Sequence, residues 1–158
     1  MERKNIIKLI ASIIFCEILG SIGAIFTSPA IPTWYAGLSK PFFNPPNWIF
    51  GPVWTLLFAM MGIAFYLVWK RGFKAKKNKI ALAFFVIQFI FNVLWSALFF
   101  GLRSPLYGLI CITFLWAAIL GTIITFYRVD KKAAYLLIPY ILWVSFAAVL
   151  NLAIFLLN

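Results

Sequence analysis

The sequence predicts an all-α membrane protein, a five-transmembrane-helix bundle with a long first loop rich in proline and aromatic residues. Three observations support this prediction. Apolar residues make up 65% of the 158 residues, and 20% are aromatic. Only three residues are acidic, so a soluble domain of this length could not cover its apolar surface. Five apolar stretches are also long enough to cross a bilayer.

Each stretch fits the length of a transmembrane helix. A helix that rises about 1.5 Å per residue needs roughly 20 residues to cross a hydrocarbon core of about 30 Å. Lys8 and Glu17 interrupt the first stretch, and the other four carry no formal charge. The short loops at 101–105 and 128–133 require antiparallel neighbours, and we expect one domain over residues 1–158. The predicted helices are 6–26, 48–69, 80–102, 106–127 and 134–157.

Lysine and arginine are divided unequally between the two sides of the predicted bundle. Twelve of the 14 lie in the N-terminal segment or in loops on its side, and only Lys40 and Arg103 lie opposite. Because basic residues near helix ends resist translocation, we expect the N-terminus in the cytoplasm and the C-terminus outside. The formal charge of +11 predicts contact with anionic membrane lipids and gives no reason to expect nucleic acid as a partner.

Several kinds of chemistry have no residues to support them. The chain contains no histidine, the commonest general base and metal ligand. Cys16 and Cys111 fall inside predicted helices, where we expect small buried residues, not a disulfide or a metal pair. No nucleophile paired with a base and no phosphate-binding loop is recognisable, so we expect no metal site and no conventional enzyme.

The first loop is unusual in composition. Six of the eight prolines lie between residues 29 and 52, among six aromatic residues. Proline fixes φ and removes a hydrogen-bond donor, so this segment cannot be one continuous helix. We favour a rigid cover over the end of the bundle. An interfacial belt of tryptophan and tyrosine is the alternative, although a belt alone would not need so many prolines.

Three motifs resemble those of one known family. They are WYAGLSKP at 34–41 with PP at 45–46 and FGPVW at 50–54, QFIFNVLW at 88–95 with FFG at 99–101, and PYILWVSFAAVLN at 139–151. They are similar to the first-loop and second-helix, third-helix and fifth-helix signatures of the translocator protein (TspO/MBR) family, also called tryptophan-rich sensory proteins or peripheral-type benzodiazepine receptors. The resemblance covers nearly the whole chain in order, and we expect a bacterial member.

The resemblance implies a membrane receptor or sensory protein that binds ligands inside the helix bundle. The implied ligands are tetrapyrroles, namely protoporphyrin IX or haem, and isoquinoline or benzodiazepine compounds. The implied role is regulation of porphyrin metabolism or of a stress response, with no obligatory cofactor. The implied location is the bacterial plasma membrane, or the outer mitochondrial membrane in a eukaryote, and a homodimer is expected. Carried over by position, the ligand-binding residues are Ala24, Tyr35, Pro45, Phe50, Gly51, Trp54, Asn92, Trp95, Tyr107, Trp143, Phe146, Ala147 and Leu150.

Side-chain spacing supports a cavity independently of the resemblance. Trp143 and Ala147 share one helical face, where a large aromatic residue beside a small one leaves a groove. Gln88, Asn92 and Ser96 recur every four residues, and this polar stripe should face the bundle interior. Interhelical hydrogen bonding is an equally good explanation of the stripe, and for Asn92 ligand contact and structural bonding are equal alternatives.

A flat tetrapyrrole would suit such a lining. Its faces can stack on tryptophan and tyrosine, while its propionates need cations at a wet end. Lys40 and Arg103 are the only cations on that side of the membrane and are the expected carboxylate partners. Without histidine, haem iron has no recognisable axial ligand, so metal-free porphyrin is expected to bind at least as readily as haem.

Two features depart from the family pattern, and one residue lies outside it. No tyrosine or basic residue follows Asn151, so the cholesterol-recognition pattern of animal members is missing and tight cholesterol binding is not expected. Glu17, near mid-span, belongs to no family motif. A carboxylate there costs roughly 2.5 kcal/mol or more unless it is neutralised or paired. Glu17 could be a protonated, hydrogen-bonded structural acid at a helix or dimer interface. The alternative is a proton- or cation-linked role. Ala83 and Ile87 stand where some members have a G-x-x-x-G-like dimer face, and the run Gly20-x-x-x-Ala24 is an available substitute.

Three function classes stay open. The leading one is a tetrapyrrole-binding sensory or regulatory protein. A tetrapyrrole transporter or exporter is the second, although five helices cannot form two equal repeats within one chain. The third is light- and oxygen-dependent porphyrin degradation, in which Trp54 and Trp143 would be the reacting indoles.

Overall fold

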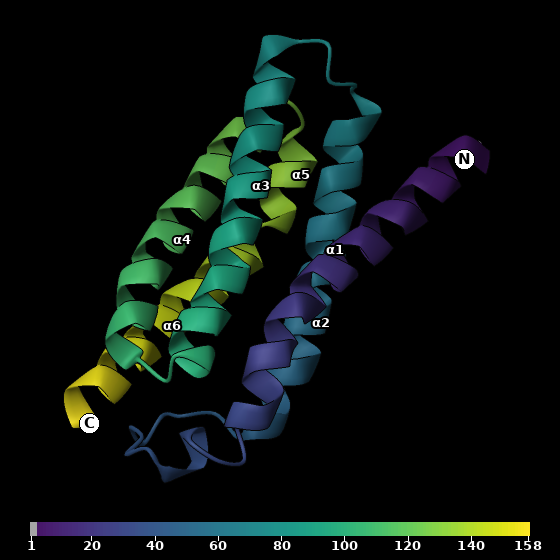
Figure 1. Cartoon of the computed structure of the whole chain (residues 1–158). Coiled ribbons are helices and arrows are strands. Elements are labelled where there is room, and N and C mark those ends of the chain that lie inside the picture. The colour runs from purple at the N-terminus through teal and green to yellow at the C-terminus, as the bar shows by residue number, and fades with distance from the viewer. Residues whose placement is uncertain (1–2) are drawn as a thin grey trace.

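The computed structural model describes residues 3–158 of the chain, which form helices joined by one long first loop and otherwise by short connections (Figure 1). The elements are α1 (Arg3–Ala30), η1 (Tyr35–Gly37), α2 (Asn47–Lys70), α3 (Lys76–Ser96), η2 (Ala97–Gly101), α4 (Pro105–Tyr127), α5 (Lys131–Leu136) and α6 (Ile138–Leu157). Five segments are long and apolar enough to cross a membrane, so the predicted all-α fold with five spans is confirmed. Helix α4 packs between α3 and α6.

Helix α1 continues four residues beyond its predicted end at residue 26. The prediction stopped where the apolar stretch gives way to Thr27, Ser28 and Pro29. In the structure the Thr27 hydroxyl donates to the Gly23 carbonyl oxygen at 3.1 Å, so this polar side chain is satisfied by the helix itself. Pro29 is tolerated because it lies in the last turn, where a missing N–H interrupts only the end of the helix.

The fifth predicted helix is divided in two. Leu137, between α5 and α6, has φ −91° and ψ −5°. Pro139, in the first turn of α6, has no N–H to continue the hydrogen bonding of α5, which explains the break. The segment also begins before the predicted residue 134. The reason is the Asp130 carboxylate, which caps α5 by accepting hydrogen bonds from the backbone N–H groups of Lys132 and Ala133.

Asp130 also joins two helices at one end of the bundle. Its carboxylate pairs with Arg71, next to the end of α2, at 2.9 Å. Partial burial raises the pKa of the Asp130 carboxyl, but the hydrogen bonds from Arg71 and from the α5 backbone hold that pKa below its ordinary value overall. The pair therefore contributes stability at neutral pH that is lost as the pH falls through the pKa of the folded state.

The third predicted helix ends in a π-helical turn, η2. The backbone N–H of Leu102 donates to the Ala97 carbonyl oxygen, five residues back, at 2.8 Å. The turn directs two consecutive aromatic residues inward, since Phe99 and Phe100 are only 2% and 9% exposed. Arg103 follows with φ 54°, in the left-handed region, where the chain reverses into α4.

Helix α1 crosses α2 at an angle, and its N-terminal part lies apart from the other helices (Figure 1). The two backbones lie close together at Gly62 of α2, where a Cβ atom would lie 2.9 Å from the Ser12 carbonyl oxygen. Gly20, which we expected in a face available for a dimer, lies against the ring of Phe58 in the same chain. Small residues therefore let α1 and α2 approach, which is a main source of helix association in lipid.

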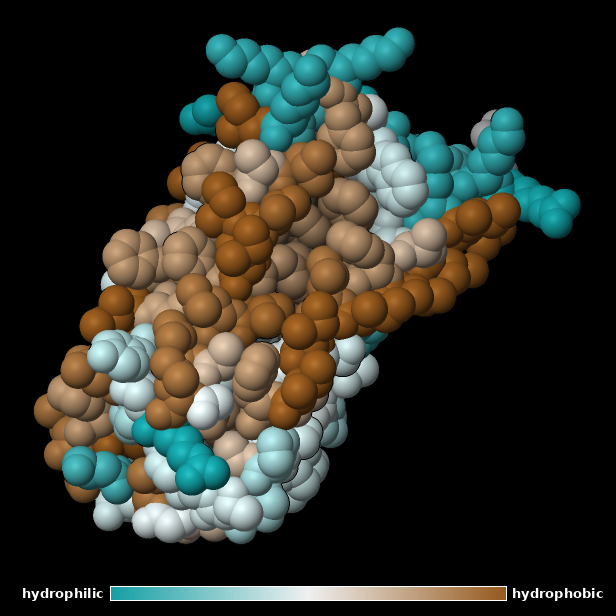
Figure 2. All heavy atoms as spheres, in the orientation of Figure 1, coloured by the Kyte–Doolittle hydropathy of each residue, from teal (hydrophilic) through white to brown (hydrophobic). Residues whose placement is uncertain are grey.

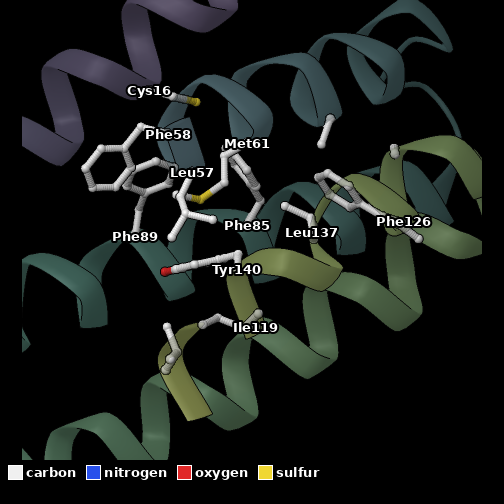
Figure 3. Close-up of a cluster of buried hydrophobic side chains, with 14 of the residues drawn as sticks. Cys16, Leu57, Phe58, Met61, Phe85, Phe89, Ile119, Phe126, Leu137 and Tyr140 are labelled. Carbon is white, nitrogen blue, oxygen red and sulfur yellow. The ribbon is translucent and has the colours of Figure 1, made fainter. Parts of the chain in front are cut away.

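Apolar side chains from all the long helices form the main core (Figure 3). Aromatic rings run through it: Phe65 stacks on Phe85 with centroids 5.1 Å apart, and Phe85 on Phe126 at 5.6 Å. Cys16 and Cys111 are free and buried, as predicted. Lipid tails are as apolar as these side chains, so close packing rather than escape from water holds the spans together.

Figure 2 shows most of the hydrophilic residues at one end of the molecule, fewer at the opposite end, and a broad apolar band between the two ends. We call the first of these ends, which holds the start of α1 and the α2–α3 connection, the basic end. The first loop (residues 31–46) and the C-terminus form the opposite end, the loop end. Exposed side chains such as Ile14, Ile18 and Ile110 cover the band between them. The chain is therefore an integral membrane protein.

Replacing Gly62 with alanine should lower the free energy of unfolding by about 1–3 kcal/mol, because the added methyl group meets the α1 backbone, which cannot turn aside as a side chain could. Thermal unfolding of the purified protein in detergent measures the effect. Gly37→Ala is the matched control, since nothing lies within 4 Å of its Cβ position. Equal midpoints for the two variants would contradict the close crossing of α1 and α2.

Candidate functional site

A cavity of about 310 Å³ lies toward the loop end, between α1, α2, α3, η2 and α6. The first loop covers it and contributes Ile31 and Tyr35 to its wall. The cavity is not fully enclosed, because lining residues such as Ala24 of α1 and Gly51 of α2 are exposed along the seam between these helices. A ligand could therefore reach it from the side of the bundle.

Ten of the thirteen predicted ligand-binding residues line this cavity. They come from α1, the first loop, α2, α3 and α6, so the fold brings together side chains from nearly the whole length of the chain. These residues are Ala24, Tyr35, Phe50, Gly51, Trp54, Asn92, Trp95, Trp143, Ala147 and Leu150.

The other three predicted ligand-binding residues lie outside the lining. Phe146 packs behind the wall, with its ring centroid 5.5 Å from that of Trp143. Pro45 lies in the first loop, where its carbonyl oxygen accepts a hydrogen bond from Asn44 Nδ2 at 3.1 Å. Tyr107, in the first turn of α4, is 53% exposed. Tyr107 lies outside the lining because it belongs to α4, which contributes no residue to the cavity wall.

The two predicted carboxylate partners also lie outside the lining. Lys40 Nζ lies 4.9 Å from the centroid of the Tyr35 ring and donates hydrogen bonds to the Ala36 and Leu38 carbonyl oxygens at 3.3 and 3.2 Å. Lys40 is thus in contact with a residue of the lining at the loop end. Arg103 follows η2 and is exposed.

Sequence reasoning missed part of the lining. Glu17, Ser21 and Ser28 of α1 face the cavity, and Phe58 and Phe99 contribute further rings. A signal for α1 was present, because positions 17, 21, 24 and 28 follow the i, i+4, i+7, i+11 pattern of one helical face. Phe99 had no comparable signal, since its direction depends on the π-helical turn.

Aromatic rings make up much of the cavity wall. Trp54 stacks on Phe58 with centroids 5.4 Å apart and an interplanar angle of 25°. Trp95 stacks on Phe99 at 5.3 Å with an angle of 21°. Trp143 adds a third indole from α6. The rings hold one another in place, so the wall is suited to stacking against a flat aromatic ligand.

A buried hydrogen-bond chain joins α3 to α6 beside the cavity. The Tyr140 hydroxyl donates to Gln88 Oε1 at 2.9 Å and accepts from Asn92 Nδ2 at 3.0 Å. Gln88, Asn92 and Ser96 are all buried, so the predicted inward polar stripe is confirmed. Asn92 serves in this structural network and also lines the cavity.

A second hydrogen-bond chain fixes the direction of Trp95. Its indole N–H donates to Asn151 Oδ1 at 3.1 Å, and Asn151 Nδ2 donates to the Pro105 carbonyl oxygen at 2.8 Å. Asn151 is 2% exposed, so water does not compete for these bonds. The ring of Trp95 is thus held from behind, by α6 and by the start of α4.

The first loop is fixed over the cavity by hydrogen bonds. The Tyr35 hydroxyl donates to Asn44 Oδ1 at 2.7 Å. Burial raises the pKa of Tyr35 to about 12, although the hydrogen bond to Asn44 lowers it, so the phenol is neutral at physiological pH. The Asn158 side chain bonds both the N–H and the carbonyl oxygen of Ser39, each at 2.9 Å.

Other residues of this region point outward. Phe42 is fully exposed and Trp48 is 73% exposed, as in an interfacial aromatic belt. This region therefore has inward residues that cover the cavity, as in the arrangement we favoured, and also outward aromatic residues of the kind that the alternative, an interfacial belt, would use.

The cavity has few ionisable groups. Its lining within residues 3–158 contains one acid, Glu17, and neither lysine nor arginine. No three His, Cys, Asp or Glu side chains of the described residues come together as metal ligands would. A ligand would therefore be held mainly by ring stacking and shape, with a few polar contacts.

The fold and this cavity define a class of membrane protein: a five-span bundle with an aromatic-lined cavity under its first loop. The chain belongs to the TspO/MBR family, whose model matches residues 12–157. It is 49% identical over 154 residues to "Tryptophan-rich protein TspO" of Archaeoglobus fulgidus, covering 98% of this chain and 99% of that protein. Over 119 residues, which are 75% of this chain and 70% of the relative, it is 40% identical to the human "Translocator protein". The resemblance drawn from the sequence motifs is therefore confirmed.

Replacing Tyr140 with phenylalanine should lower the free energy of unfolding by about 1 kcal/mol, because Gln88 and Asn92 lose their shared partner. Chemical unfolding in mixed micelles measures the change. Tyr127→Phe is the control, since within residues 3–158 the Tyr127 hydroxyl makes no hydrogen bond. A loss as large in the control as in the Tyr140 variant would contradict the role of the buried network.

Proposed function

We propose that this chain is a membrane sensory receptor that binds tetrapyrroles, protoporphyrin IX above all, in the cavity under its first loop. One observation carries the proposal: three indole side chains, Trp54, Trp95 and Trp143, line one cavity inside a bundle of the TspO/MBR family. A relative from Cereibacter sphaeroides, 33% identical over 148 residues, is named "Tryptophan-rich sensory protein", which favours the sensory class.

The shape of the site suits a flat ligand larger than the cavity itself. A volume of about 310 Å³ is at the lower end of the roughly 300–1,000 Å³ typical of ligand pockets. A tetrapyrrole would fill the space between the rings and extend through the α1–α2 seam toward the lipid. Isoquinoline or benzodiazepine ligands, which are smaller, would fit within the walls.

The charged groups of the ligand would lie at the loop end of the cavity. Porphyrin propionates need cations, and Lys40 is in contact with Tyr35 of the lining. Arg103 is the second expected partner at the loop end. The charge distribution favours the loop end outside the cell and the basic end in the cytoplasm, since basic residues concentrate at the latter.

Light- and oxygen-dependent porphyrin degradation is a second candidate. The observation that favours it is that Trp54 and Trp143, the indoles expected to react, line the same cavity. Measuring pigment loss in the dark and in the light separates this activity from simple binding.

Changing both Trp54 and Trp143 to phenylalanine should weaken protoporphyrin IX binding about tenfold, because each smaller ring loses stacking area worth about 0.5–1.5 kcal/mol. The shift of the porphyrin absorption band on titration measures affinity without relying on protein fluorescence. Trp69→Phe, outside the lining, is the control. An unchanged titration and unchanged pigment loss in light would remove both indoles from the site.

A tag placed after Asn158 should react with a membrane-impermeant reagent added to intact cells, whereas a tag before Met1 should react only after the cells are opened. The reason is the concentration of basic residues on the N-terminal side. The opposite labelling pattern would contradict the proposed orientation and would place the first loop in the cytoplasm.

A further inference from the structure

We propose that Glu17 is a recognition group for a basic nitrogen on the ligand that occupies the cavity. This inference deepens the proposed function and rests on the same cavity. Glu17 lies near the middle of α1, and its side chain lines the cavity. A carboxyl group inside a membrane is costly and is kept where it has a partner or a function.

Glu17 belongs to a polar stripe along the seam between α1 and α2. Ser21 and Ser28 lie one and three turns further along the same face of α1. On α2, Asn47 and Thr55 line the same cavity. Polar side chains are unfavourable on a helix face that contacts hydrocarbon. We therefore infer that the polar part of a ligand lies along this stripe.

The neighbouring hydroxyl groups do not supply the hydrogen bonds that Glu17 needs. Ser21 donates to the Ile18 carbonyl oxygen at 2.8 Å, and Thr55 donates to the Gly51 carbonyl oxygen at 3.0 Å. Both hydroxyl protons are therefore engaged within their own helices. Glu17 itself forms no hydrogen bond or ion pair with any residue from 3 to 158.

Basic side chains do not reach Glu17 either. Lys8, the nearest basic residue along α1, is nine positions earlier, roughly 13 Å along the helix axis, and its Nζ lies 5.6 Å from the centroid of the Trp69 ring. Tyr35, the other ionisable group among the described lining residues, donates to Asn44 at the loop end. Residues 3–158 supply no partner for Glu17, so we assign its partner to the ligand, and a carboxylate is best satisfied by a charged N–H donor. The ligand class is an aromatic body carrying a lipophilic amine or a protonated imine nitrogen.

A matched pair of fluorescent probes tests this assignment. 1-Pyrenemethylamine and 1-pyrenemethanol share an aromatic body and differ in the basic nitrogen, and both can be titrated against tryptophan emission of the protein in nanodiscs of zwitterionic lipid. The wild type should bind the amine at least about tenfold more tightly than the alcohol. In Glu17→Gln, which keeps the side-chain size and removes the charge, the ratio should fall to about one while alcohol affinity is unchanged. Asp130→Asn, the same change outside the cavity, should keep the wild-type ratio.

The outcomes separate this inference from the proposed function. A ratio near one in the wild type, or an equal ratio in Glu17→Gln, would overturn it. Loss of a dimer in Glu17→Gln with the amine preference intact would assign Glu17 to an interface between copies and would also overturn it. Protoporphyrin IX titrated into the same samples tests the proposed function alone: a wild type that prefers the amine but binds no porphyrin would support Glu17 and contradict the tetrapyrrole proposal.

Discussion

Hydrocarbon offers no hydrogen-bond partner, and this constraint shapes the chain at every level. Backbone polar groups in the spans must be bonded within the protein, so the spans are helical. The N–H groups are paired even where the helices are irregular. The N–H of Leu102 donates to the Ala97 carbonyl oxygen, and that of Leu137 donates to the Ala134 carbonyl oxygen. Polar side chains follow the same rule. The Thr122 hydroxyl returns to its own helix at the Ala118 carbonyl oxygen, 2.8 Å away, whereas the Tyr140 network connects two helices.

The cavity follows from how the helices can associate when lipid supplies no hydrophobic force between them. Glycine at position 62 brings α1 onto α2 toward the basic end. Nearer the loop end the space between these helices and α6 is filled by rings that hold one another, and the gap that remains is lined by indoles. Asn151 accepts a hydrogen bond from the indole N–H of Trp95 and so holds this ring in place. The same residues therefore stabilise the bundle and line the cavity. A ligand in the cavity would supply contacts to the rings that the bundle alone does not make.

The sequence predicted the spans well because hydropathy and length are direct consequences of the bilayer. It also predicted most of the lining, since motif positions on α2, α3 and α6 keep their direction along a regular helix. It failed where local geometry departs from the α-helix. Pro139 sets the break before α6, the Thr27 hydroxyl extends α1, and the π-helical turn directs Phe99, none of which a 3.6-residue period describes. The role of Glu17 stayed open because its surroundings come from two helices, and only the fold shows that neither supplies a partner.

The central claim is that the cavity under the first loop is the binding site for tetrapyrroles. Hydrogen exchange measured by mass spectrometry, with and without protoporphyrin IX in nanodiscs, tests it most directly. The account predicts slower exchange in residues 31–46, where the loop covers the cavity, and no change in residues 71–75 of the α2–α3 connection at the basic end. Protection confined to residues 71–75, or no protection of the first loop at saturating porphyrin, would contradict the account.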